Sequence, residues 1–203
     1  MVFIGFPFGL PASSRSAGKM LSEHQITELL KARPISARAP WCEDNDELVE
    51  SFYQDAVAEI ERKAKLKSRV EYHPGSGFAS FINGWFYDDS YAGKGRVRGS
   101  IECAGVSVVL SRFAPYYVLG ESVEWRSRGC RSCCSPSLNL VDRFEHLHVR
   151  VFGQTIETIL EERGLLRLSR SDLQRPIAEH HDVPTILSSP PWTEFDALFY
   201  FED

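Results

Sequence analysis

Apolar residues recur at helical spacing in two long stretches of the chain. Between Asp46 and Lys65, steps of three and four residues place one apolar stripe on a helix: Leu48, Val49, Phe52, Tyr53, Ala56, Val57, Ile60 and Ala64. A second stripe lies within residues 145–163 and consists of Val149, Phe152, Ile156, Ile159 and Leu160. Gly164 follows where a helix C-cap is expected. The pattern predicts two amphipathic helices, each with one buried face.

Capping sequences indicate two shorter helices. Ser22 is followed three positions later by Gln25, which is the spacing of a capping box, and Pro34 stops the helix that begins there. Ser169 and Asp172 have the same spacing and predict one more short helix near the C-terminal end.

The stretch from about residue 69 to residue 126 has the pattern of a sheet. Glycines separate short aromatic runs, and residues 96–110 alternate, with a turn or bulge expected at Ala104-Gly105. The segment from Tyr116 to Trp125 predicts one or two further strands, interrupted at Gly120. Short strands with tight connections favour antiparallel pairing, because a parallel crossover needs a longer connection.

Two more apolar segments each predict a single strand. The first is Leu138–Val141, and the second is Ala197–Phe201, which we expect to be a final strand that docks on the sheet. The predicted fold class is therefore α+β, with N-terminal helices, a central antiparallel sheet, C-terminal helices and a final strand. A chain of 203 residues is long enough for one substantial core. We expect residues 1–19, rich in Gly, Pro and Ser, to be a flexible leader, and residues 20–203 to form a single domain.

The charge balance favours a protein partner over nucleic acid. The formal net charge is -5, whereas nucleic-acid binders need a basic face to neutralise phosphates. The one dense basic stretch contains Arg126, Arg128 and Arg131, and it leaves a nucleic-acid module as a weaker alternative. An acidic protein suits a basic protein partner through complementary charge.

The same sequence predicts a cytoplasmic protein without a membrane anchor. No apolar run approaches the roughly 20 residues that span a bilayer. The apolar N-terminal segment has no basic residues before it, so a secretory signal is not expected. Five cysteines are an odd number, which favours reduced thiols over a disulfide framework.

The cysteine-rich segment carries the sharpest local chemistry. Cys130 and Cys133 have the two-residue gap that lets two thiolates bind one zinc ion, and His146 or His148 could supply a third ligand. The remaining ligand would be Cys134 or Cys103. A zinc-binding module or zinc-dependent enzyme is therefore the alternative hypothesis, and zinc is the one cofactor that the sequence suggests.

Other groups of polar residues have simpler structural explanations. Asp142 and Glu145 beside His146 and His148 suit the start of a helix, and we expect them to act as capping residues. The group His180, His181 and Asp182 lies in a proline-flanked connector, where a structural role or solvation is expected. The sequence contains neither a phosphate-binding glycine loop nor a Gly-x-Ser-x-Gly nucleophile motif, so we expect no catalytic activity.

The C-terminal segment interleaves aromatic and acidic residues, which suits a protein interface. The ending from Phe195 to Asp203 resembles the C-termini of bacterial immunity proteins from polymorphic toxin systems, as does the preceding segment Gly164–Leu173. The resemblance implies a small, cytoplasmic, non-catalytic protein that binds one cognate toxin and blocks it. The residues that we expect to contact this toxin, or another basic protein, are Glu194, Asp196, Tyr200, Glu202 and Asp203.

Overall fold

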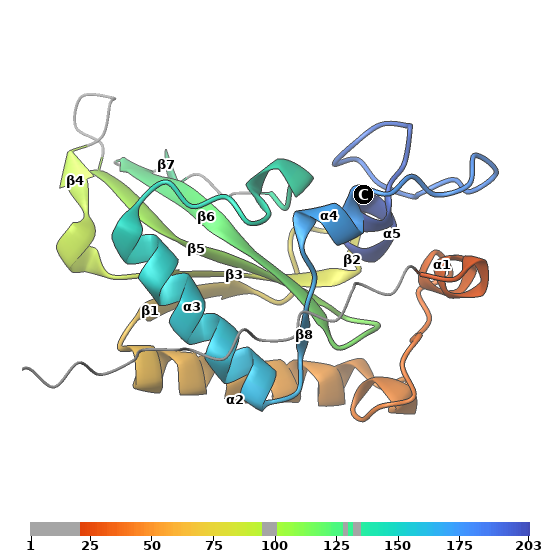
Figure 1. The fold of residues 1–203 in the computed structure, drawn as a ribbon, viewed down its shortest axis with the longest axis horizontal. Coiled ribbons are helices and arrows are strands. Elements are labelled where there is room, and N and C mark those ends of the chain that lie inside the picture. Colours follow the sequence, from red (N-terminus) through yellow and green to blue (C-terminus); the bar gives the residue numbers. More distant parts are fainter. Residues whose placement is uncertain (1–20, 95–100, 128–129, 132–134) are drawn as a thin grey trace, which may run out of the picture.

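A seven-stranded sheet and the helices around it form the centre of the computed structural model, which describes residues 21–94, 101–127, 130–131 and 135–203 (Figure 1). The strands are β1 (Lys67–Glu71), β3 (Phe81–Tyr87), β4 (Gly93–Lys94), β5 (Ile101–Ser111), β6 (Tyr116–Ser127), β7 (Cys130–Arg131) and β8 (Leu166–Arg167). The helices are α1 (Glu23–Leu29), α2 (Asp46–Ala64), α3 (Leu147–Glu162), α4 (Arg170–Leu173) and α5 (Glu194–Leu198). Short 3-10 helices are η1 (Trp41–Glu43), η2 (Asp89–Tyr91) and η3 (Leu138–Leu140). The predicted α+β class is confirmed.

The sheet is antiparallel along its main path, as predicted, and its order is β1-β3-β5-β6-β7. The short strand β4 pairs with β5, and β8 pairs with β6 in parallel. The parallel pair is possible because α3 carries the chain back along the sheet before β8 begins. A separate two-stranded sheet joins β2 (Phe78–Ala79) to β9 (Phe201–Glu202).

The predicted helices form where local sequence specifies them. The side chain of Asn45 accepts the N–H groups of Glu47 and Leu48, so α2 begins at Asp46 with its acidic first turn facing the helix dipole. The capping boxes expected at Ser22 and Ser169 are both present. Beyond the end of α3, Gly164 has a φ of 81°, a left-handed conformation that glycine adopts without strain.

Both glycines at which the sequence predicted a break lie inside continuous strands. A Cβ on Gly105 of β5 would lie 2.6 Å from the carbonyl oxygen of Phe86 and from Nε1 of Trp85. A Cβ on Gly120 of β6 would lie 1.9 Å from the carbonyl oxygen of Leu140. The glycines therefore allow close approach by neighbouring groups, and the predicted turn and interruption are wrong.

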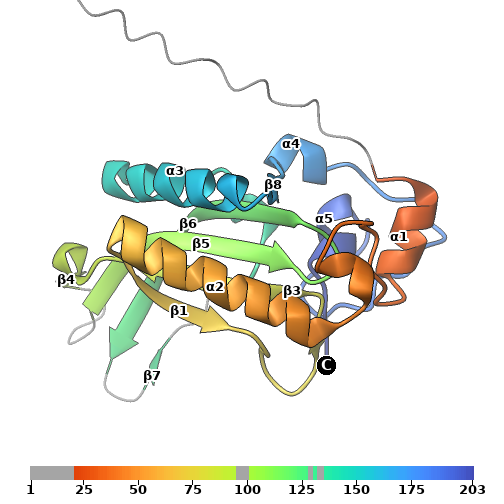
Figure 2. The same cartoon turned by 90° about the horizontal axis from the view of Figure 1, so that it is seen from below.

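The two faces of the sheet are buried against different elements. Val106, Val108 and Leu110 of β5 pack with α2 and α3, which lie side by side on one face (Figure 2). Val109, which points the other way, belongs to a second apolar cluster with α1 and α5. Because that cluster covers only one end of the second face, the other end is lined by polar side chains.

The C-terminal segment differs from the prediction of one strand over Ala197–Phe201. A capping box between Thr193 and Asp196 starts α5, and Ala197 and Leu198 are completely buried in that helix. Only Phe201 and Glu202 are extended, and they pair with β2 instead of joining the central sheet. The other predicted strand, at residues 138–141, is η3 followed by an isolated bridge between Val141 and Gly120. Along the described ranges, no helix has both the length and the apolar character needed to cross a bilayer.

Candidate functional site

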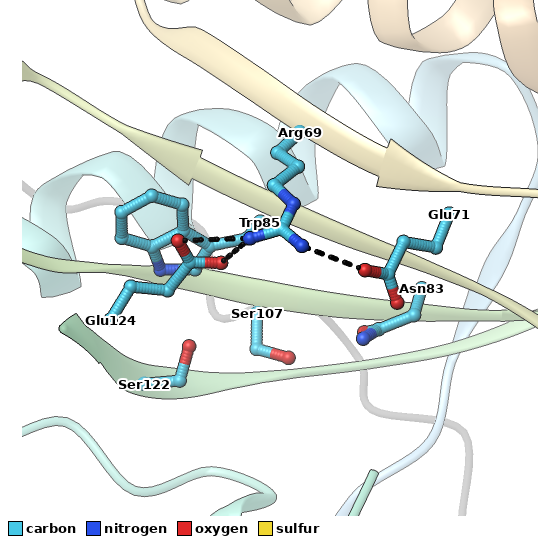
Figure 3. Close-up of a pocket in the computed structure, with 7 residues that line it drawn as sticks. All are labelled: Arg69, Glu71, Asn83, Trp85, Ser107, Ser122 and Glu124. Atoms are coloured by element: carbon cyan, nitrogen blue, oxygen red, sulfur yellow. Dashed lines mark hydrogen bonds and ion pairs between the residues drawn. The ribbon is translucent and has the colours of Figure 1, made fainter. Parts of the chain in front are cut away.

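A polar hollow lies on the sheet face opposite α2 and α3 (Figure 3). Four neighbouring strands line it, because alternate residues of each strand point to the same side. The lining residues are Arg69 and Glu71 of β1, Asn83 and Trp85 of β3, Ser107 of β5, and Ser122 and Glu124 of β6. We call this group the sheet hollow.

An arginine between two carboxylates dominates the electrostatics of the sheet hollow. Nη1 of Arg69 donates to Oε1 and Oε2 of Glu124 at 3.2 and 3.4 Å, and Nη2 donates to Oε1 of Glu71 at 3.1 Å (Figure 3). The side chain of Glu124 is only 5% exposed, and a carboxylate this deeply buried needs a cation beside it. The sheet hollow thus places two carboxylates on either side of one guanidinium.

The neighbouring polar groups are also buried. Asn83, Ser107 and Ser122 are almost inaccessible, and among the residues that the structure describes Oγ of Ser122 has no hydrogen-bond partner. A buried hydroxyl without a partner destabilises a fold by about 1–3 kcal/mol, so a group that bonds to it from outside would gain affinity. The indole of Trp85 stacks on Tyr87, with ring centroids 4.1 Å apart, and forms a flat aromatic wall.

The size of the sheet hollow limits what can enter it. The atoms around it leave room for about one water molecule. A single polar group of a partner fits this space, whereas enclosure of a small-molecule substrate needs a cavity of roughly 300 Å³ or more. The geometry therefore suits recognition of one side chain from a partner.

The structure brings His146 and His148 close together but gives each its own role. His146 precedes α3, and its Nδ1 lies 2.5 Å from Oε1 of Glu121, while Oε2 of Glu121 accepts the N–H groups of Glu145 and His146, both at 2.8 Å. Glu121 thus caps α3, where the His146 side chain forms no capping bond. His148 stacks on Tyr91 with ring centroids 4.0 Å apart, and burial lowers the pKa of its imidazole.

Asp142 and Glu145 do not cap α3, the helix for which the sequence predicted them as capping residues. Asp142 accepts the N–H of Arg170 at 2.8 Å, and so it supports the first turn of α4 instead of α3. Glu145 pairs with Arg143 at the surface. The capping carboxylate of α3 comes from β6, which sequence proximity could not show.

The cysteine part of the zinc hypothesis stays a prediction. Cys133 and Cys134 lie outside the described residues, as does Arg128 of the basic stretch. The backbone of Cys130 pairs with Ser127 at the end of β6, six residues beyond Glu121 and therefore about 20 Å away along an extended strand.

The predicted C-terminal contact residues divide into buried and exposed groups. Glu194 and Tyr200 are only 5% and 1% exposed, so both are buried in the folded chain, and their contact with a partner stays a prediction. The hydroxyl of Tyr200 donates to the carbonyl of Leu29 at 3.0 Å, and Asp196 is engaged in the capping box of α5. Glu202 and Asp203 are exposed and remain available to a partner.

The sheet hollow was not predicted from the sequence, although a weak signal was present. Arg69 and Glu71 alternate along one strand, as do Ser122 and Glu124, and such spacing places polar groups on one face. Only the strand order shows that these two faces are the same. Comparisons with protein-family models, curated proteins and solved structures found no match to this chain.

Proposed function

We propose that this chain is a non-catalytic binding protein that neutralises a cognate toxin, or another basic protein, by occlusion. In this proposal the sheet hollow receives a basic side chain of the partner. The observation that carries it is the group formed by Arg69, Glu71 and Glu124, in which two carboxylates line one hollow and that of Glu124 is buried. A cation that enters would be attracted by the two carboxylates, and their oxygens would replace water that it loses.

Three further features support this proposal. The space for one small group matches the tip of a side chain, and the hydroxyl of Ser122 offers a hydrogen-bond acceptor there. The ring of Tyr87, which is half-buried and stacks on Trp85, is the kind of aromatic group that contributes strongly to protein interfaces. Because β1 lies at an edge of the sheet, a partner could reach Glu71 without displacing another strand.

The experiment combines co-expression with direct binding. The product of the gene immediately upstream serves as the candidate toxin, and the assays are growth rescue and affinity by titration calorimetry. Glu71→Gln removes charge from the sheet hollow, and Glu161→Gln makes the same change at an exposed position of α3, on the other side of the sheet. We expect Glu71→Gln to weaken binding about tenfold, or about 1.4 kcal/mol, and Glu161→Gln to leave it unchanged.

The outcomes separate the function from the site. If the wild-type chain neither binds this product nor restores growth, toxin neutralisation through that product is refuted. If binding occurs but the two variants weaken it equally, the sheet hollow is not the contact surface. Added salt should weaken the wild-type complex more than the Glu71→Gln complex, because one charge pair has been removed.

A further inference from the structure

Two adjacent histidines and a glutamate from the opposite end of the chain converge beside α1. Glu23 is the first residue of α1, and His180 and His181 lie in the connector between α4 and α5, which runs next to α1 (Figure 2). Nε2 of His180 lies 2.9 Å from Oε1 of Glu23, and Nε2 of His181 lies 2.7 Å from the same oxygen. All three ligand atoms lie within 4.8 Å of one another.

The connector holds the histidines in place through its own anchors. Ile177 and Val183, on either side of the pair, are buried in the same apolar cluster as the inner face of α1. Between them the N–H of His181 donates to the carbonyl of Ala178 at 3.0 Å and closes a turn. The packing of the connector thus presents both imidazoles to Glu23, and this preorganisation reduces the entropy lost when a ligand binds.

The three side chains differ in burial in a way that suits ion entry. The side chain of His181 is 8% exposed, whereas those of His180 and Glu23 are 69% and 56% exposed. One ligand therefore faces the protein and two form an accessible rim. The imidazole rings are 4.2 Å apart between centroids and inclined by 37°, so both nitrogen atoms can point toward a common position.

We propose that Glu23, His180 and His181 bind one divalent transition-metal ion, with Zn²⁺ as the preferred ion. Zinc takes imidazole nitrogens and carboxylate oxygens at about 2.0–2.2 Å, so tetrahedral ligand atoms lie about 3.3 Å apart. The three ligand atoms now lie at most 4.8 Å apart, so shifts of about 1.5 Å or less in their separations bring them to the tetrahedral spacing. Two nitrogen ligands select against Ca²⁺ and Mg²⁺, which prefer oxygen.

This site differs from the one that the sequence suggested, and it revises the role in structure or solvation expected for the histidine pair. Three protein ligands leave one coordination position for water. The bound ion would connect α1 to the segment between α4 and α5, elements that are distant in sequence. A ligand that binds only the folded chain stabilises it, so zinc should raise the unfolding temperature.

The test is a calorimetric titration of the full chain with ZnCl₂, with no polyhistidine tag and with alkylated thiols so that cysteines cannot contribute. His180→Ala/His181→Ala removes both imidazoles. His73→Ala is the matched control, because His73 forms a single histidine–carboxylate pair, with Nε2 3.1 Å from Oε1 of Glu50. We expect the wild type and the control to bind about one equivalent of zinc. Binding by the double variant should be at least about tenfold weaker, because losing even a residue that only orients a metal ligand has an effect of this size.

Each result decides for or against the site. Binding that is equal in the wild type and the double variant overturns the proposal, as does a wild-type chain that binds no zinc. If the double variant fails to fold, the single change His180→Ala replaces it, since that side chain is largely exposed. At least tenfold weaker binding by His180→Ala then supports the site, and a smaller loss overturns it.

Discussion

Two buried serines should respond in opposite ways to the same substitution. Oγ of Ser80 accepts the N–H of Tyr200 at 2.8 Å and can donate to the carbonyls of Leu198 and Tyr200 at 2.9 and 3.2 Å. Ser80→Ala leaves that N–H buried without its partner, which costs about 1–3 kcal/mol, and it also loses a hydrogen bond to a carbonyl. We expect a net loss of about 2 kcal/mol, or about 4–8 °C in unfolding temperature.

Ser122→Ala removes a hydroxyl that has no hydrogen-bond partner in the described part of the chain. The folded state loses no bond and no longer buries an unpaired polar group, so the free energy of unfolding should stay unchanged or rise by up to about 1 kcal/mol. If the sheet hollow binds a partner through this hydroxyl, the same variant should bind more weakly while being at least as stable.

The assay is urea denaturation followed by tryptophan fluorescence and by circular dichroism. Equal m-values in the two variants and the wild type would show that the same surface is exposed on unfolding, so that midpoints report stability. The reasoning is refuted if both substitutions cost the same free energy. A loss above about 1 kcal/mol in Ser122→Ala would show that this hydroxyl has a partner within the folded chain.

Three further changes probe other parts of the structure. Gly120→Ala places a Cβ against the carbonyl of Leu140 and should lower the free energy of unfolding by about 1–3 kcal/mol. Gly93→Ala is the control, because a Cβ there meets no atom within 4 Å, and equal urea midpoints for the two variants would contradict the close approach at Gly120. Glu121→Ala removes the acceptor of two N–H groups at the start of α3 and should lower the free energy of unfolding by about 3 kcal/mol. Amide hydrogen exchange in the first turn of α3 should become faster, and unchanged exchange would argue against capping by Glu121. Burial raises the pKa of Glu194, so the folded state binds a proton more tightly than the unfolded state, and stability falls as pH rises above the ordinary value of 4.5. Glu194→Gln should therefore be more stable than wild type at pH 7 and lose that advantage below pH 4.5; a difference that does not change with pH would contradict the sign.

Local signals predicted the helices well because their causes lie within a few residues. The capping groups of α1 and α4 act over three positions, and the apolar stripes of α2 and α3 repeat within each helix. The same local logic failed at Gly105 and Gly120. A glycine in a strand has the same sequence signature whether it permits a turn or the close approach of a neighbour.

The C-terminal segment shows why pattern alone was insufficient there. Alternating aromatic and acidic residues suit a half-buried strand, but Thr193 and Asp196 also form a capping box that starts α5. Burial of Phe195 and Leu198 against α1 then favours the helix, since apolar area removed from water contributes more than strand propensity. Exposure of Tyr200 could not be judged without knowing that packing.

The sequence by itself determined the fold class, the long helices and the caps of α1 and α4, because these depend on periodicity and on hydrogen bonds between near neighbours. Only the tertiary structure decided which polar residues meet. Arg69 and Glu124 are 55 positions apart and are brought together by the pairing of four strands, and Glu23 meets His181 across 158 positions. Such contacts depend on the packing of the whole chain, so no local pattern specifies them.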